Sequence, residues 1–343
     1  MVPSRQIAYG LFRRHLVCNT LVNIHGKPCP EPVSTVAEFI ARRPVLARVP
    51  SEDIRLVGEK LGRCFTIGTK PGTQLVKSLT TALDEFHESG ICLSGFDESN
   101  LVVSEESPEL LFHPTKDSKT EPPEDLPPGA FAMPRFMVRP DPGKLKFQDV
   151  SFHQSTPASI QANYLDAHLF ITKSLLPPEF PVPGSIKHLL KLLKSPESAN
   201  MAPLISSHAA TVPFGRRRGL DLDYIPYIRK VLPYEDRAAE ATVLAEIPYL
   251  DDWIERAKKN KLLELFFNHR RDKYREDGTG LLVFYYDVSI NRMEWCWSRW
   301  FKPNGGYTSH EVEIVMDVTY PDLMPMIQES LWKTNHLKKA HDD

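Results

Sequence analysis

The sequence lacks the features that mark disulfide-bonded, membrane-spanning or strongly charged proteins. Its five cysteines are scattered without C-x-x-C spacing, which argues against a disulfide framework and favours reduced thiols. No apolar run reaches the roughly 18 residues that a membrane span needs, and no signal peptide is visible. The net charge of −2 gives no global attraction to nucleic acid. We therefore expect a soluble protein of the cytoplasm, with the nucleus as the alternative location.

The most informative stretch is residues 83–103, LDEFHESGICLSGFDESNLVV. Apolar residues upstream of it recur at helical spacing and predict a helix that ends at Ser89-Gly90, where glycine adopts left-handed backbone readily. A loop that ends in Asn100 follows, and Leu101-Val102-Val103 predicts a short strand. With 343 residues and 41% hydrophobic residues, the whole chain can bury cores in about two domains.

This order of helix, loop and strand resembles the catalytic loop of protein kinases, whose pattern is H-R-D-L-x-x-x-N. In that alignment Gly95 stands where the catalytic Asp belongs, and Asn100 matches the metal-binding Asn. Asp149 follows a strand-like run from Lys144 and takes the place of the Asp in D-F-G. A lone Asp at a strand end is more often a turn residue, so we expect neither a metal ion nor another cofactor. The resemblance implies a kinase-like C-lobe that keeps this order of helix, loop and strand but lacks its catalytic base.

Residues 1–33 contain neither the Gly-rich loop nor the V-A-I-K lysine of a kinase N-lobe. We interpret them as an N-terminal segment or a remnant of that lobe, and residues 34–212 as the kinase-like C-lobe. Within it, residues 104–143 hold nine of the thirty prolines and many acidic residues, which predicts an insertion without a core of its own. A partner-binding motif in this insertion is the alternative. We expect neither phosphotransfer nor nucleotide binding. Near the start of the C-lobe, Thr35 and Glu38 predict a helix capping box, and Ser185 is expected to cap a later helix.

Residues 213–338 resemble a second module. Arg216-Arg217-Arg218 with Leu220, Asp223 and Ile228 is similar to R-L-x-F-L-x-D-V-S-D-R-I, which begins the kinase-extension nuclease (KEN) domain. That domain follows the kinase module in the inositol-requiring enzyme family of unfolded-protein-response sensors and in ribonuclease L. Further matches in the family's order are Trp253, Leu262-Leu263, Leu265-Phe266, Tyr274, Gly280-Leu281-Leu282, and residues 309–315 and 319–323. The resemblance implies an all-helical KEN-like domain. Independently of it, Pro321 is expected in the first turn of a final helix.

The nuclease residues of that family are mostly replaced here. The family places them in L-L-R-A-x-R-N-K-x-x-H, with a tyrosine upstream. Aligned on Leu281-Leu282, Tyr286 replaces the Arg, Asp287 the Asn and Asn291 the His, and only the upstream Tyr274 is kept. An Asp adds negative charge where a phosphate must bind, and an Asn cannot transfer a proton. The resemblance therefore implies a degenerate nuclease site.

A basic run near this site consists of Arg270, Arg271, Lys273 and Arg275. Such a run can contact RNA phosphates, although it is more often a solvated helix face. RNA is accordingly one candidate partner.

Together these observations predict a mainly α (α+β) protein, a kinase-like C-lobe fused to an all-helical KEN-like domain. The expected function is that of a pseudokinase and KEN-like binding or dimerisation module related to RNA processing in the unfolded protein response. The expected partner is a second copy or a related kinase–nuclease, since the family's extension dimerises back to back. A residual endoribonuclease is the alternative.

Overall fold

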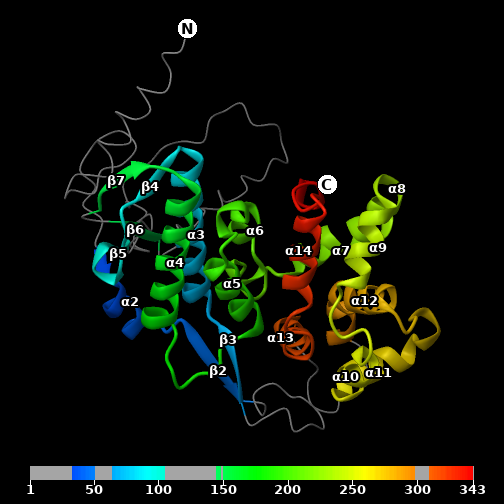
Figure 1. Ribbon diagram of the computed structural model, residues 1–343. Coiled ribbons are helices and arrows are strands. Elements are labelled where there is room, and N and C mark those ends of the chain that lie inside the picture. Colours follow the sequence, from blue (N-terminus) through cyan, green and yellow to red (C-terminus); the bar gives the residue numbers. More distant parts are fainter. Residues whose placement is uncertain (1–32, 51–63, 105–143, 148–149, 298–308, 343) are drawn as a thin grey trace, which may run out of the picture.

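The computed structural model describes residues 33–50, 64–104, 144–147, 150–297 and 309–342 (Figure 1). Most of the segment 1–33, nearly all of the insertion 104–143 and Asp149 therefore lie outside the described residues. The predictions made for those three regions stay predictions.

The described chain is mainly helical, with a few short strands in its N-terminal part. The strands are β1 (Val33–Thr35), β2 (Leu46–Pro50), β3 (Cys64–Gly68), β4 (Ile91–Leu93), β5 (Leu101–Ser104), β6 (Lys144–Phe147) and β7 (Phe152–Gln154). The helices are α2 (Val36–Arg42), α3 (Lys70–Glu88), α4 (Pro157–Phe170), α5 (Gly184–Lys194), α6 (Ala202–Ser206), α7 (Arg218–Pro226), α8 (Leu232–Glu235), α9 (Arg237–Ala245), α10 (Trp253–Lys258), α11 (Lys261–His269), α12 (Gly278–Trp297), α13 (Ser309–Thr319), α14 (Leu323–Lys333) and α15 (Lys339–Asp342). No strand occurs among the described residues after Gln154, so the expected mainly α class is confirmed.

The strands form three small antiparallel sheets, two of which hold the loop 94–100 at its ends. Before the loop, β4 pairs with β7, with Leu93 opposite Phe152. After it, β5 lies between β1 and β6, with Val103 opposite both Ser34 and Leu145. The pair β2–β3 forms the third sheet. The loop is therefore anchored by strands from distant parts of the sequence.

The predicted helix before this loop is confirmed as α3. Thr69 caps its first turn by accepting a hydrogen bond from the Gly72 amide. Leu75, Leu79 and Leu83 are fully buried along one face. The helix ends at Glu88, and Gly90 has a φ of +76°, which explains why glycine follows the last turn.

Two predicted helix starts are wrong. Ser185 was expected to cap α5, but the helix begins at Gly184 after Pro183. Ser185 is instead buried, and its hydroxyl lies 3.4 Å from an Arg217 nitrogen, so a tertiary contact replaces the local cap. Pro321 was expected in the first turn of a helix, but it precedes α14, whose N-terminal flanking residue is Asp322.

The C-terminal part packs around an aromatic core. Trp253 is buried against the rings of Phe267 and Phe284, at centroid distances of 5.8 and 5.5 Å. Tyr274 meets Phe284 edge-on at 5.4 Å. Because α10, α11 and α12 each supply one or more of these rings, the three helices are held together at this point.

Helix α14 joins the two parts of the chain. It contacts α5 and α6 on one side and α7 and α9 on the other, and Figure 1 shows it standing between them. The hydrophobic core is continuous across this junction. The residues on α14 therefore decide how the N-terminal part meets the C-terminal part.

Candidate functional site

The loop 94–100 carries no side chain at the position that matches the catalytic Asp of kinases. Gly95 has a φ of +121°, and a Cβ built on it would lie 3.8 Å from an Asp166 oxygen. Asn100 uses its side-chain oxygen to accept a hydrogen bond from the Asp97 amide at 3.1 Å. Asp97 in turn accepts hydrogen bonds from the amide and hydroxyl of Ser99, at 2.8 and 2.6 Å. These polar groups thus close the loop on itself.

The start of the loop is fixed by a buried asparagine of α4. Asn163 accepts a hydrogen bond from the Leu93 amide at 3.0 Å and donates one to the Leu93 carbonyl at 2.9 Å. Both backbone groups of Leu93 are satisfied, although the residue is 1% exposed. Asp166, one turn further along α4, accepts a hydrogen bond from the Phe96 amide. The loop is therefore rigidly docked on α4.

A groove of about 580 Å³ lies between this loop, α4 and the helical turn Ile171–Leu175 that follows α4. We call it the acidic groove, and its lining residues are Phe96, Asp97, Glu98, Asp166, Leu169, Phe170, Lys173 and Ser174. Burial raises the pKa of Asp166, whereas the hydrogen bonds from Ser99 lower the pKa of Asp97. The groove combines an apolar floor with carboxylates, so it can hold a ligand that carries both apolar and positively charged groups.

Two of the predicted nuclease-site residues, Tyr274 and Asp287, meet Arg270 of the basic run in the C-terminal part. The Tyr274 hydroxyl donates a hydrogen bond to Asp287 at 3.3 Å, and an Arg270 nitrogen lies 3.7 Å from the same carboxylate oxygen. Tyr274 is only 7% exposed, and its burial, followed by the Asp287 charge, raises its pKa. The phenol is therefore held as a neutral donor to Asp287 and is poorly suited to accept a proton from substrate.

The remaining predicted residues are spread around this cluster. Tyr286 is half-buried against the core, and Asn291 lies in α12 with its side chain outside the described residues. Arg271, Lys273 and Arg275 are exposed.

The basic run alternates with acidic residues. Arg275 lies 2.9 Å from Asp277, Asp272 lies within the run, and Glu276 follows it directly. A phosphate backbone would meet this mixture of charges rather than a uniformly basic face. The exposed face therefore offers little electrostatic support for RNA binding.

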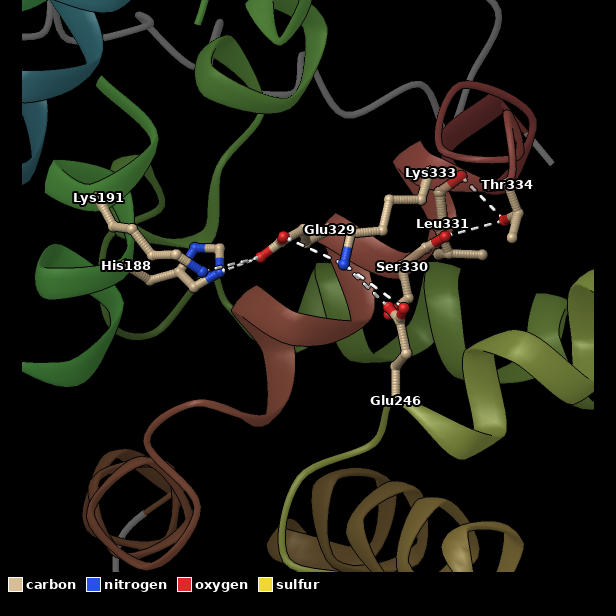
Figure 2. A network of polar contacts seen from close by, with 8 residues as sticks. All are labelled: His188, Lys191, Glu246, Glu329, Ser330, Leu331, Lys333 and Thr334. Atoms are coloured by element: carbon tan, nitrogen blue, oxygen red, sulfur yellow. Dashed lines mark hydrogen bonds and ion pairs between the residues drawn. The ribbon is translucent and has the colours of Figure 1, made fainter. Parts of the chain in front are cut away.

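A buried polar network at the junction was not expected from the sequence (Figure 2). His188 of α5 lies between His208 and Glu329 of α14. Its Nδ1 is 2.9 Å from His208 Nε2, and its Nε2 is 2.8 Å from a Glu329 oxygen. His208 is fully buried, and its Nδ1 accepts a hydrogen bond from the Ala210 amide at 3.0 Å.

These contacts fix the protons on both imidazoles. Since His208 Nδ1 accepts from an amide, its only proton is on Nε2 and is donated to His188 Nδ1. His188 must then carry its own proton on Nε2 and donate it to Glu329. A second proton on His208 would have to sit on Nδ1, where it would point at the Ala210 N–H, which is also a donor. Accordingly, burial and then the nearby His188 lower the pKa of His208 well below its ordinary value.

Glu329 also connects to cations around the junction. Lys333 lies 3.2 Å from one of its oxygens and Lys191 lies 3.9 Å from the other. The hydrogen bond from His188, together with these charges, lowers the pKa of Glu329 to about 2. Lys333 also reaches Glu246, which follows α9, at 3.2 Å. Figure 2 shows Lys333 between the two carboxylates.

Gln328 completes the junction beside this network. Its side-chain oxygen accepts from the Ala209 amide at 2.7 Å, and its nitrogen donates to the Ser207 carbonyl at 2.9 Å and to the Tyr224 hydroxyl at 3.1 Å. The available sequence signal was that Gln328 falls on the apolar stripe of α14, four residues after Met324. A polar residue on such a stripe indicates a buried polar contact without identifying its partner.

Among the described residues, no cluster of three or more His, Cys, Asp or Glu side chains is arranged to hold a metal ion. In the same part of the chain, no helix has both the length and the apolarity to cross a bilayer. The sequence matches no protein-family model and no curated protein sequence. The kinase-like and KEN-like interpretations therefore rest on the residues and contacts of this chain.

Proposed function

We propose that this protein is a catalytically degenerate relative of the kinase–KEN proteins and acts by binding. Residues 34–212 would form a kinase-like C-lobe, and residues 213–338 a KEN-like domain, in the context of RNA processing by the unfolded protein response. The order of the two sets of motifs supports this assignment, as does the helical character of the described C-terminal part.

The observation that carries the proposal is that the expected proton-transfer positions are empty or occupied by structural contacts. Gly95 has no side chain to act as a base, and the Tyr274 hydroxyl donates to Asp287 inside the fold. General acid–base catalysis contributes roughly 10²–10⁴-fold to a rate, and loss of one charge-stabilising donor costs roughly 3 kcal/mol of barrier. At the KEN-like positions, Asn291 replaces a proton-transferring His and Asp287 replaces a charge-stabilising Asn. The loss of both contributions leaves no useful rate of phosphodiester cleavage.

A residual endoribonuclease is the second candidate function. The observation in its favour is that Tyr274 and Arg270 converge on one carboxylate oxygen of Asp287. The cluster contains a phenol and a guanidinium, which are the kinds of donor that a cleavage site needs. Against it stands Asp287, whose negative charge repels a phosphate at the same place.

Incubation of the purified protein with structured RNA separates these two functions. We expect no cleavage above the buffer control. Cleavage that is abolished by Tyr274→Phe and kept by Tyr234→Phe, at a tyrosine that is 89% exposed, would establish the endoribonuclease instead.

Association is measured independently by sedimentation and by co-purification with an active kinase–nuclease. The proposal expects a complex with a second copy or with that enzyme at micromolar concentration. Absence of both complexes would refute the proposed dimerisation.

A further inference from the structure

The helix that supports the loop 94–100 has an uncovered apolar stripe. Leu165 and Leu169 of α4 are 42% and 40% exposed, although most large hydrophobic residues of the described chain are buried. They are four residues apart and so lie on the same side of the helix. The opposite side is buried through Tyr164, Ala167 and Phe170. The exposed stripe therefore runs beside the acidic groove, to which Leu169 belongs.

The groove has an excess of negative charge. Asp97, Glu98 and Asp166 contribute three carboxylates to its lining, and Lys173 contributes one ammonium group. Hydrogen bonds from Ser99 hold Asp97 in its charged form, since they lower its pKa. Asp166 is half-buried, and its desolvation raises its pKa. A cation brought next to Asp166 would offset that desolvation, so the groove favours positively charged occupants.

The size and shape of the groove limit what can occupy it. About 580 Å³ accommodates a few side chains and is too small for a folded domain. Phe96 and Phe170 supply an apolar floor, and Leu169 extends it toward the exposed stripe. An occupant that matches all three features is a chain segment with bulky apolar side chains next to a positive charge.

From this complementarity we infer that the acidic groove docks a linear segment of a partner protein, one that presents an arginine or lysine beside bulky apolar side chains. The inference rests on the proposed function, because it assigns a surface to a protein that acts by binding. It does not use the C-terminal helices or the Tyr274 cluster. If the groove binds no such segment, the RNA-cleavage and association experiments therefore still test the proposed function independently.

The test is a fluorescence-anisotropy titration of the full-length protein with a short synthetic peptide. The peptide carries arginines on either side of a Leu-Leu-x-x-Leu core, and a second peptide replaces each arginine by glutamate. We expect the arginine peptide to bind with micromolar affinity, more weakly at higher salt, and the glutamate peptide to bind at least tenfold more weakly. Equal binding of both peptides, or no binding of either, would overturn the inference.

Variants locate the binding. Leu169→Ser should weaken the arginine peptide on the order of tenfold, because it removes most of one leucine's apolar contact. Its control is Leu265→Ser on α11, where the leucine is also 40% exposed. Glu98→Lys should weaken binding several-fold, and Glu197→Lys, at another exposed glutamate, is its control. Circular dichroism confirms that each variant is folded.

The pattern across the variants decides between occupants. If Leu169→Ser and Glu98→Lys both weaken binding of the arginine peptide and both controls keep it, the result supports a basic, apolar segment in the groove. Equal effects of groove and control variants would refute it. If Leu169→Ser instead abolishes self-association seen by sedimentation while the peptide never binds, the occupant is a second copy and the inference is wrong.

Discussion

Mild acid should destabilise the fold through His208. In the folded chain this ring is fully buried and its Nδ1 accepts from the Ala210 amide, so it must be neutral. In the unfolded chain it is free to bind a proton. Lowering the pH therefore favours unfolding, because only the unfolded state gains the proton.

The loss in free energy of unfolding can be worked out from the difference between the pKa of His208 in the unfolded and folded chain. Burial lowers the folded pKa of His208 well below its ordinary value of 6.5. The stabilisation is therefore fully present above pH 6.5 and is lost as the pH falls below that value, at up to about 1.4 kcal/mol per pH unit. Between pH 7 and pH 5 the loss in free energy of unfolding is about 2 kcal/mol. Glu329 has its pKa lowered to about 2 from 4.5, so its stabilising contribution is lost mainly below about pH 4.5.

Urea denaturation at a series of pH values, followed by tryptophan fluorescence, measures this slope. His87 also has its pKa lowered by burial and adds a slope of the same sign, so a variant is needed for assignment. His208→Asn keeps a side-chain acceptor for the Ala210 amide but has no imidazole to titrate. It should be less stable than the parent at pH 7, and the difference between them should shrink by about 2 kcal/mol at pH 5. His153→Asn, at an exposed ring, is the matched control for the replacement of a histidine by asparagine.

Two outcomes would refute the reasoning about His208. If the free energy of unfolding were constant between pH 7 and pH 5, the ring would not be held neutral by its surroundings. If His208→Asn kept the full pH slope of the parent, the slope would belong to other groups. In either case the proton assignment along His208, His188 and Glu329 would have to be abandoned.

Two further predictions use the same denaturation measurement at neutral pH. Gly184→Ala should destabilise the fold by about 1–3 kcal/mol, because the new methyl group would lie 2.7 Å from the Pro321 side chain. In the control Gly219→Ala, in α7, the methyl group meets no atom within 4 Å, so this change should be neutral or stabilising by up to about 1 kcal/mol. Equal effects of the two substitutions would contradict the close approach of α5 to Pro321. Glu329→Gln should cost about 2–3 kcal/mol because it removes the charged acceptor that His188 and Lys333 contact, although Lys333 keeps Glu246, and a cost below about 0.5 kcal/mol would show that the network contributes little.

Features determined by short stretches of sequence were predictable. The spacing of Leu75, Leu79 and Leu83 identified the buried face of α3, and Gly90 marked its end. Thr35 and Glu38 were predicted to form a capping box, and both hydrogen bonds are present at 3.2 and 3.0 Å. In each case the interacting residues lie within a few positions of one another, so a local pattern was sufficient.

Features that depend on distant residues were not predictable from one sequence. His188 and Glu329 are 141 positions apart, and neither was singled out as a site residue. Ser185 has the right residue type for a helix cap, but its contact with Arg217 across the junction replaces that role. The acidic groove likewise forms only when the loop 94–100 docks on α4 through Asn163, a contact between positions 70 apart. Periodicity and capping rules contain no information about such pairs.

The composition of the junction gives a reason why a binding protein would keep it. Buried ion pairs contribute little net stability compared with apolar residues of similar volume, because desolvation offsets most of the attraction. Apolar contacts, however, tolerate sliding and repacking, whereas hydrogen bonds with fixed donors and acceptors do not. Gln328 and Glu329 satisfy backbone and imidazole groups on the N-terminal side while α14 is held by Glu246 on the other. The network therefore favours one relative orientation of the two parts, as the proposed binding function would require.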